Sequence, residues 1–355
     1  MTLHAKKQLD TIKPYVPGAF EAGAVKLSSN ENPLGFSDQA KEAYKKAADD
    51  LAFYPDGGCN ELREALAKTH GLKKEEIVVG AGSDEMIRTL FHAFAKEGDE
   101  IIYPECDFLM YPLSTQVNGA KQVPVKDMNF HLDPHSIIDK ITDKTRVIIF
   151  SNPHVPAGSF LSYDEICGLI SRISSDILVV LDAAYAEYMF EGDDYNPGHE
   201  LVRTYENVVV LRTFSKAYGL AGLRVGWAHA SSSVIDALNC VRGAFNVSMP
   251  AQKAAIAALS DQAFVKKTRD YTAEVRNDFI VKLTGMGFHV YPSHTNFILV
   301  DFGSDERANI VRNYLKNNKV LVRPMGFCNL GHCLRFSVGL KEDMDMVASL
   351  LKEMA

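Results

Sequence analysis

The middle of the chain alternates short apolar runs with longer segments of helical periodicity. Several of the short runs are apolar at every position, which is typical of strands covered on both faces. The strands are expected at residues 77–79, 100–103, 122–125, 146–150, 178–182 and 208–212, with helices such as 83–95 and 162–173 between them. Strand and helix alternating over about 150 residues predict an α/β fold with a doubly wound, mostly parallel sheet.

The last third of the chain has a different pattern. A long helical stretch over residues 250–286 is followed by short strands near 297–301, 320–323 and 334–337. Before the alternating region, residues 1–35 contain three prolines and show no clear periodicity. The sequence therefore predicts an N-terminal arm over 1–35 that joins the small domain, a large ligand-binding domain over 36–245, and a small α+β domain over 246–355.

Charge and cysteine content narrow the class of protein. The 355 residues carry 38 Lys and Arg against 45 Asp and Glu, a net charge of −7, which disfavours nucleic acid as a partner. No apolar run approaches the roughly 20 residues of a membrane span, and the two early lysines precede no apolar core like that of a secretory signal. Six cysteines in a chain this long form no disulfide framework. We expect a cytoplasmic protein without membrane or nucleic-acid partners.

Three groups of residues fall at the carboxyl ends of expected strands, where open α/β sheets bind ligands. In the first, the strand at 77–79 runs into Gly80-Ala81-Gly82-Ser83-Asp84 and then a helix. Small residues and a helix N-terminus suit an anion such as a phosphate, although glycine turns at this position are common without one. In the second, Asp182 ends a buried strand, either to cap the next helix or to hold a protonated nitrogen of a ligand.

The third group follows the strand at 208–212. Lys216 and Arg224 lie among glycines and apolar residues there. A lone lysine is usually exposed, but apolar flanks favour burial, which lowers the pKa of a lysine and makes it a nucleophile. Arg224 supplies charge for a phosphate. An amine, a carboxylate and a phosphate cradle together are what pyridoxal 5'-phosphate requires.

These motifs resemble those of the fold-type I pyridoxal-phosphate aminotransferases, and most closely those of the histidinol-phosphate aminotransferases. The resemblance covers nearly the whole chain and rests on residues 14–18, 27–35, 54–57, 82–85, 212–227 and 333–339. Asn30-Glu31-Asn32-Pro33-Leu34-Gly35 and the Lys216 motif are its most diagnostic parts. It implies a reversible transaminase that interconverts L-histidinol phosphate and 2-oxoglutarate with imidazole acetol phosphate and L-glutamate, in histidine biosynthesis.

The same resemblance implies roles for individual residues. Lys216 forms the Schiff base with pyridoxal phosphate and moves the substrate proton, and Asp182 pairs with the ring nitrogen. The remaining cofactor contacts implied are a stacked ring from Phe108, hydrogen bonds to the phenolic oxygen from Tyr185 and Asn152, and phosphate contacts from Ser83, Asp84, Ser215 and Arg224. The substrate contacts implied are Tyr15, Tyr111, Asn152, Asn246, Arg323 and Arg335. Tyr54 reaches the neighbouring site of an obligate homodimer.

Two stretches need separate interpretation. The usual Asn-Pro-Asn-Asn-Pro-Thr-Gly segment reads Asn152-Pro153-His154-Val155-Pro156-Ala157-Gly158, so the hydrogen bonds of this loop must differ, and His154 either packs the loop or touches the site. Cys328, His332 and Cys333 offer three metal ligands without an obvious fourth, and we expect no metal site.

Several alternatives stay open at this level. Arg323 makes either a substrate-phosphate contact or a structural pair at the domain seam. Related enzymes act on aromatic amino acids, and threonine-phosphate-type decarboxylases share the fold. A ligand-sensing module on the same fold usually follows a DNA-binding domain, for which the 35-residue arm is short and the acidic balance unsuited.

Overall fold

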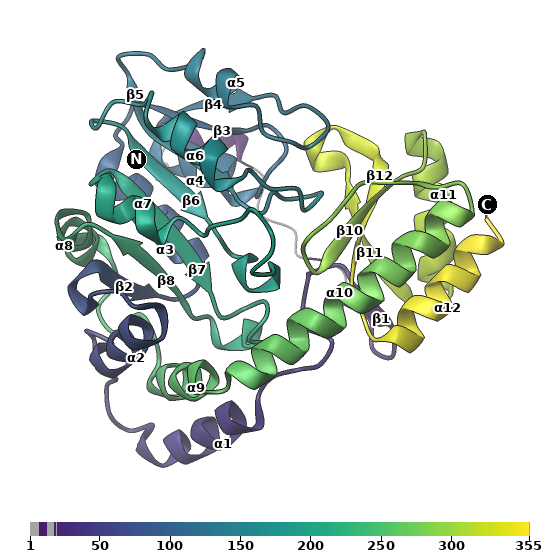
Figure 1. The fold of residues 1–355 in the computed structure, drawn as a ribbon, viewed down its shortest axis with the longest axis horizontal. Coiled ribbons are helices and arrows are strands. Elements are labelled where there is room, and N and C mark those ends of the chain that lie inside the picture. The colour runs from purple at the N-terminus through teal and green to yellow at the C-terminus, as the bar shows by residue number, and fades with distance from the viewer. Residues whose placement is uncertain (1–6, 13–17, 19, 355) are drawn as a thin grey trace, which may run out of the picture.

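The computed structural model describes residues 7–12, 18 and 20–354, which form a larger and a smaller part joined by a long helix (Figure 1). Among these residues the larger part contains a seven-stranded sheet in the order β2-β8-β7-β6-β5-β3-β4. Its strands are β2 (Ile77–Gly80), β3 (Glu100–Pro104), β4 (Lys121–Val125), β5 (Thr145–Ser151), β6 (Leu178–Asp182), β7 (Val208–Thr213) and β8 (Gly226–Ala230). β8 runs antiparallel to both of its neighbours, and all the other pairs are parallel.

Helices cover both faces of this sheet. Alternate residues of each strand enter different cores: Val147 and Ile149 pack on one side, Ile148 and Phe150 on the other. One face is covered by α3 (Ser83–Phe94), α4 (Met110–Asn118) and α8 (Ser232–Val241). The other is covered by α2 (Asn60–His70), α5 (Pro134–Ile138), α6 (Tyr163–Ile170), α7 (His199–Thr204) and α9 (Met249–Ser260), with α1 (Asp38–Ala47) packed on α9. This two-sided cover explains the unbroken apolar strands and confirms the expected α/β fold.

The smaller part has its own sheet, in the order β1-β11-β12-β10-β9. Its strands are β1 (Val25–Leu27), β9 (His289–Val290), β10 (Phe297–Asp301), β11 (Val320–Met325) and β12 (Leu330–Ser337). One face packs on α10 (Gln262–Gly285), α11 (Asp305–Asn317) and α12 (Lys341–Lys352). The opposite face, which carries Phe297, Leu299 and Arg335, turns toward the larger part. β1 is parallel to β11, so residues of the expected arm form an edge of this sheet.

The expected single helix over 250–286 is two helices, α9 and α10, which meet at Asp261. The Asp261 side chain accepts from Phe264 N and starts α10 as its N-cap. α9 packs on α1 and α2 in the core of the larger part. The chain therefore passes from the larger to the smaller part after α9, later than the expected domain boundary at residue 246. Within the described residues, no helix has both the length and the apolar character that crossing a membrane requires.

Candidate active site

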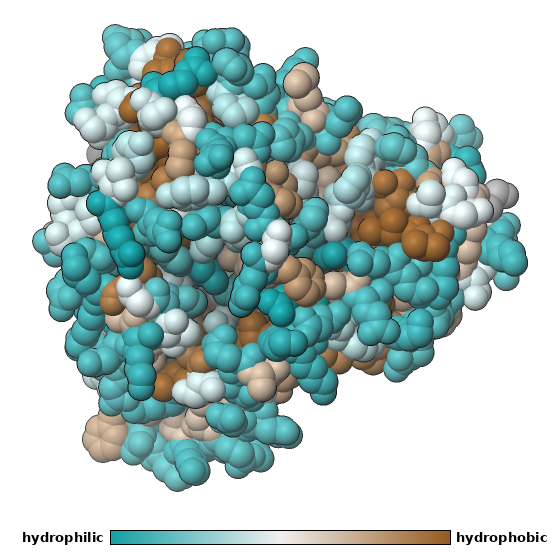
Figure 2. Space-filling view, viewed as in Figure 1, coloured by the Kyte–Doolittle hydropathy of each residue, from teal (hydrophilic) through white to brown (hydrophobic). Residues whose placement is uncertain are grey.

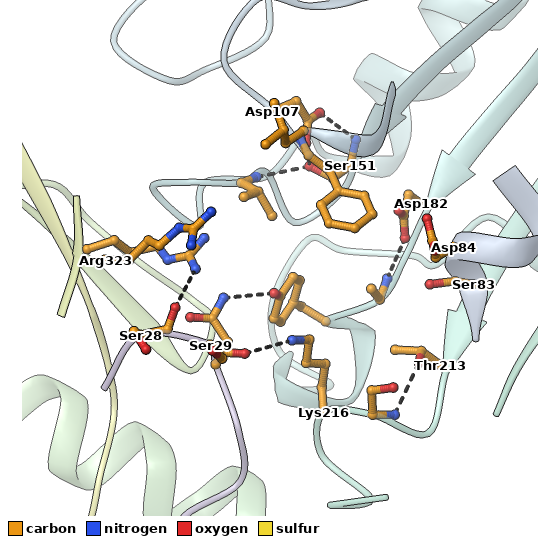
Figure 3. A pocket seen from close by; sticks show the side chains of 18 of the residues that line it. Ser28, Ser29, Ser83, Asp84, Asp107, Ser151, Asp182, Thr213, Lys216 and Arg323 are labelled. Atoms are coloured by element: carbon orange, nitrogen blue, oxygen red, sulfur yellow. Dashed lines mark hydrogen bonds between the residues drawn. The ribbon is translucent and has the colours of Figure 1, made fainter. Parts of the chain in front are cut away.

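A cavity of about 200 Å³ lies where the two parts meet, at the carboxyl ends of β5, β6 and β7 (Figure 3). Its walls come from the arm, from the larger sheet and from β11 and β12 of the smaller one. Most of the expected site residues line it, namely Ser83, Asp84, Phe108, Asp182, Tyr185, Ser215, Lys216, Arg224, Arg323 and Arg335, together with Ser28, Ser29, Asn30, Asp107 and Ser151.

Lys216 enters the cavity from the turn after β7. Its Nζ donates to the backbone oxygen of Ser29 at 3.3 Å and lies 5.5 Å from the centre of the Tyr185 ring. The hydroxyl of Tyr185 accepts from the Asn30 side chain at 2.9 Å. Asn30 is buried, and its backbone oxygen accepts from Asn296 Nδ2 at 2.9 Å, so this arm residue bonds to both parts of the protein. Only the family motif, and no local pattern, pointed to Asn30.

Asp182 is the last residue of β6, and its buried side chain lines the cavity. Its two oxygens accept from the Tyr111 hydroxyl at 3.0 Å and from Ala184 N at 3.2 Å. Burial raises its pKa to about 6, although these bonds and the charge of Lys216 act in the opposite direction. Asp182 does not cap the next helix, because the short helix at Ala186–Tyr188 has Tyr185 as its N-cap. The carboxylate therefore faces the cavity as a ligand for a cation or donor.

The glycine turn before α3 packs tightly against Arg224. A side chain at Gly82 would place its Cβ 2.5 Å from the Arg224 guanidinium, and one at Gly226 would come 2.2 Å from Ser83 N. Arg224 Nη1 in turn donates to the Ser215 hydroxyl at 3.2 Å. No side chain caps the first turn of α3, and the N-terminus of that helix opens on the cavity. A helix N-terminus and an arginine side by side have the chemistry that suits an anion.

Two arginines lie opposite each other on the wall contributed by the smaller sheet. Arg323 of β11 and Arg335 of β12 are direct partners in the antiparallel register, so their side chains leave the same face. Arg335 lies over Phe297, 5.3 Å from the ring centre, and Arg323 lies over Phe327 at 5.5 Å. Like charges directly opposite are unfavourable in a sheet. The pair brings two positive charges to this wall of the cavity.

The structure does not bring every expected residue to the cavity. Tyr111 is completely buried behind Asp182, so the geometry does not support contact with a substrate. The Asn152 side chain bonds both backbone atoms of Leu161, and Asn246 donates to Glu85 at 2.7 Å. None of the three lines the cavity. Tyr15 lies outside the described residues.

Tyr54 lies away from the cavity of its own chain. Its side chain is 83% exposed and stacks on Phe245, with ring centres 4.8 Å apart. The same surface exposes Leu51 and Phe53. We call these four residues the aromatic patch.

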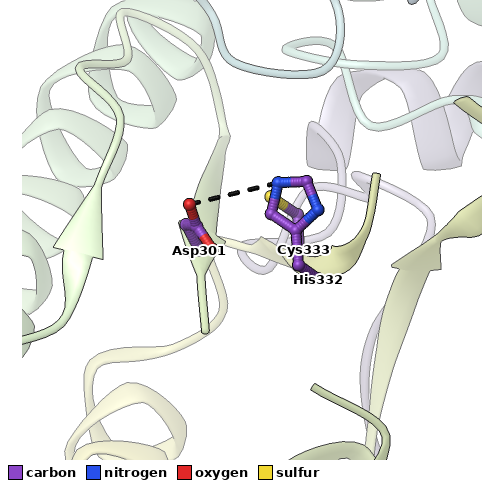
Figure 4. Close-up of side chains that lie close together, drawn as sticks. All are labelled: Asp301, His332 and Cys333. Carbon is purple, nitrogen blue, oxygen red and sulfur yellow. Dashed lines mark ion pairs between the residues drawn. The ribbon is translucent and has the colours of Figure 1, made fainter. Parts of the chain in front are cut away.

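Asp301 joins two of the residues considered as metal ligands. The ligand atoms of Asp301, His332 and Cys333 lie within 4.8 Å of one another (Figure 4). The Cys333 thiol is buried, which raises its pKa to about 12 and favours the protonated form over the thiolate that binds metals. His332 Nε2 and Asp301 Oδ2 are 4.0 Å apart. The absence of a metal site therefore stays our prediction.

Comparison with known proteins adds to this geometry. Residues 22–351 match the family model described as aminotransferase class I and II. The chain belongs to this family. Its sequence is 40% identical over 349 residues to histidinol-phosphate aminotransferase of Rhodopseudomonas palustris (strain BisB5), and the match covers 96% of this chain and 95% of that one. It is also 40% identical over 345 residues to the enzyme of the same name from Rhodospirillum centenum, with the same coverage.

Solved aminotransferase structures share the fold. Histidinol-phosphate aminotransferase from Sinorhizobium meliloti, solved with pyridoxal 5'-phosphate, superposes with a TM-score of 0.89 at 28% identity, covering 93% of this chain and 90% of that one. A Thermus thermophilus aspartate aminotransferase mutant gives a TM-score of 0.86 at 23% identity, covering 99% of each chain. The second likeness concerns the fold alone.

Proposed function

We propose that this aminotransferase binds pyridoxal 5'-phosphate and transfers the amino group between L-histidinol phosphate and 2-oxoglutarate, giving imidazole acetol phosphate and L-glutamate. Its relatives at 40% identity carry the name of this enzyme. The observation that carries the proposal is that the cross-strand pair Arg323 and Arg335 lines the same cavity as Lys216 and Asp182.

The chemistry of the cavity fits the cofactor. The buried carboxylate of Asp182 suits a protonated pyridine nitrogen, and the Lys216 amine suits an aldehyde. The N-terminus of α3, the Ser215 hydroxyl and Arg224 together suit a phosphate. When bound, the cofactor supplies an electron sink for the substrate carbon that bears the amine.

Lys216 is positioned to move a proton at that carbon. Its Nζ lies in the cavity between Ser29 and the ring of Tyr185. Asn30 fixes the Tyr185 hydroxyl, and so the polar edge of that ring is held beside the amine. Phe108 lines the wall next to Asp107 and offers an apolar face to a planar ring.

The two arginines decide between substrate classes. L-Histidinol phosphate brings a phosphate dianion, and glutamate brings two carboxylates, so either can neutralise both cations. An aromatic amino acid brings one carboxylate and so matches the two positive charges less well. The arginine pair thus favours doubly anionic substrates over phenylalanine or tyrosine.

A single-turnover absorbance experiment tests the proposal. L-Histidinol phosphate is added to the pyridoxal form of the enzyme without an oxo acid, and the visible band should convert to the near-ultraviolet pyridoxamine band. Lys216→Ala should abolish the conversion. If phenylalanine or tyrosine converts the band and histidinol phosphate does not, the substrate assignment is wrong. If no amino substrate converts it and threonine phosphate releases carbon dioxide, the enzyme is a decarboxylase.

A second experiment examines the arginine pair. Arg323→Gln should raise KM for histidinol phosphate at least tenfold, because a charged hydrogen bond of about 1.5–3 kcal/mol is lost. The half-buried Arg312→Gln on α11, which bonds Asn313 outside the cavity, is the matched control and should leave KM unchanged. An unchanged KM in Arg323→Gln would support the alternative that Arg323 is structural.

We also propose that the enzyme is a homodimer in which Tyr54 reaches the site of the second copy. The support is the aromatic patch, where Tyr54 and Phe53 are 83% and 73% exposed beside Phe245. Tyr54→Phe should keep the dimer and weaken cofactor binding, whereas Tyr54→Asp should shift sedimentation toward the monomer. A wild-type chain that sediments as a monomer contradicts this.

We also propose a cytoplasmic location. The cysteines of the described residues are all free thiols, which suits a reducing compartment.

A further inference from the structure

The turn after β5 departs from the pattern usual in the family at His154, and the structure shows where that side chain goes. His154 is 2% exposed and lies beside Asp107, which lines the cavity. Its backbone is held on both sides, since its N donates to Ser159 O and its O accepts from Gly158 N. The ring is therefore fixed in the interior behind the cavity wall.

Two carboxylates approach the ring from one side. Nε2 of His154 is 3.5 Å from Oδ2 of Asp127 and 4.0 Å from Oδ2 of Asp107. Within the described chain, neither ring nitrogen of His154 nor Oδ2 of Asp127 has a hydrogen-bond partner. Buried polar atoms are rarely left unsatisfied. A shift of about half an ångström brings Nε2 and Asp127 into bonding distance.

The charges around the ring set its tautomer. Burial lowers the pKa of His154 to about 3, helped by His131, and raises the pKa of Asp127 to about 6, helped by Glu105. At neutral pH the imidazole is thus uncharged and Asp127 is ionised, whereas burial raises the pKa of Asp107 to about 8 and keeps that carboxyl mostly protonated. A neutral imidazole has one donor, and among the described residues the ionised Asp127 faces Nε2, so the proton belongs on Nε2. Cys106, close to both carboxylates, stays a neutral thiol because burial and Cys328 raise its pKa.

Asp107 connects this cluster to the cavity wall. Its Oδ1 accepts from Phe108 N at 2.7 Å, and its Oδ2 accepts from Ser151 N at 2.9 Å. The Ser151 hydroxyl donates to Asp107 and accepts from Val155 N, which follows His154. One carboxylate thus holds together the end of β5 and the segment that carries Phe108.

We propose that His154 is a positioning residue, whose Nε2–H serves Asp127 and whose ring, packed beside Asp107, thereby fixes the wall that carries Phe108. The inference rests on the proposed function, because it assigns to that wall the binding of the cofactor ring. The role is peculiar to a histidine at this position of the turn and concerns a side chain that does not touch the substrate.

Removing the donor should weaken binding and change its pH dependence. In His154→Leu, Asp127 loses the donor that faces it, so its pKa rises and it becomes protonated at higher pH, whereas Asp107 keeps its donors from Phe108 and Ser151. The dissociation constant of pyridoxal phosphate should rise about tenfold to a hundredfold, the range that an unsatisfied buried polar group costs. KM should rise with it while kcat changes less, and the acid limb of the kcat/KM profile should move to higher pH.

Three variants separate this role from simple packing. His154→Gln retains an N–H at similar reach and should restore most of the affinity and the wild-type acid limb. Asp127→Asn in the His154→Leu background removes an unpartnered carboxylate and should recover part of the loss. The exposed His135→Leu on α5 is the matched control and should behave as wild type.

The readouts distinguish failure of this inference from failure of the proposed function. Cofactor dissociation and melting temperature are measured on each variant alongside turnover. If wild type converts histidinol phosphate but His154→Leu keeps its cofactor affinity and its acid limb, the positioning role is refuted. If His154→Gln is as impaired as His154→Leu, the ring acts by packing and the donor role is refuted. If wild type binds the cofactor and converts no amino substrate, the proposed function is refuted. The cofactor affinities of the His154 variants then still test the positioning role.

Discussion

Asp182→Asn tests the central electrostatic feature of the site. In the cofactor-free chain, burial raises the Asp182 pKa to about 6, so the carboxyl is about 90% ionised at pH 7 and about 10% at pH 5. Only the ionised form pairs with a cationic ring nitrogen. Cofactor affinity that depends on this pair should therefore fall about tenfold, or ~1.4 kcal/mol, between pH 7 and pH 5.

The variant removes this dependence together with the charge. At pH 7, Asp182→Asn should bind pyridoxal phosphate about tenfold to a hundredfold more weakly, since a hydrogen bond to a charged group contributes about 1.5–3 kcal/mol. The gap between wild type and variant should shrink about tenfold at pH 5. Equilibrium dialysis of the cofactor against apoprotein at both pH values measures both effects, and titration of the cofactor itself cancels in the ratio.

The control is Asp99→Asn, a buried aspartate that accepts from Lys96 N outside the cavity. It should bind the cofactor like wild type at both pH values. An affinity ratio that is the same at pH 7 and pH 5 would show that the raised pKa of Asp182 does not govern binding. A variant that binds as well as wild type would show that the carboxylate does not face the ring nitrogen.

Two further predictions concern backbone packing and buried histidine. Gly226→Ala should weaken cofactor binding at least tenfold, because its Cβ meets Ser83 N at 2.2 Å and must displace the turn before α3; Gly222→Ala, with nothing within 4 Å, is the control in the same dialysis assay. Burial lowers the pKa of His70 to about 3 in the folded chain, so folding loses stability as the pH falls below the unfolded pKa of about 6.5. Urea denaturation should show His70→Phe losing about 2 kcal/mol less than wild type between pH 7 and pH 5.

Periodicity predicted the parallel core of the larger sheet because its strands are buried on both faces. β6 was expected at its observed bounds, β5 is one residue longer at each end than expected, and β7 is one residue longer at its carboxyl end. β8 was not predicted, since Gly226–Ala230 begins with a glycine and follows directly on the Lys216 motif. Its burial comes from antiparallel pairing with β7 and β2, a long-range contact that no local pattern carries.

The sequence predicted those cavity residues that a strand end or a contiguous motif marks, and it missed those that meet only through long-range packing. Lys216, Asp182 and Arg224 stand at strand ends and inside a motif, and all three line the cavity. Tyr111 was assigned to substrate because the motif gives a position and no direction, and the structure turns its hydroxyl toward Asp182. Asp107 was overlooked because its partner Ser151 is 44 residues away, and the two meet only after β5 has joined the sheet.

The arm shows why this site depends on the whole fold. The backbone oxygen of Ser29 accepts a hydrogen bond from Lys216. Asn30 accepts from Ser337 and Asn296 and donates to the Tyr185 hydroxyl. The backbone oxygen of Ser28 lies 3.5 Å from Arg335. These three consecutive residues are the stretch that lies between the lysine of the larger part and the arginine of the smaller one. Because β1 follows its register with β11, a one-residue slip of the arm would turn each of these groups to the opposite side. The distance between the Lys216 amine and the two arginines is therefore set by strand pairing in the smaller sheet.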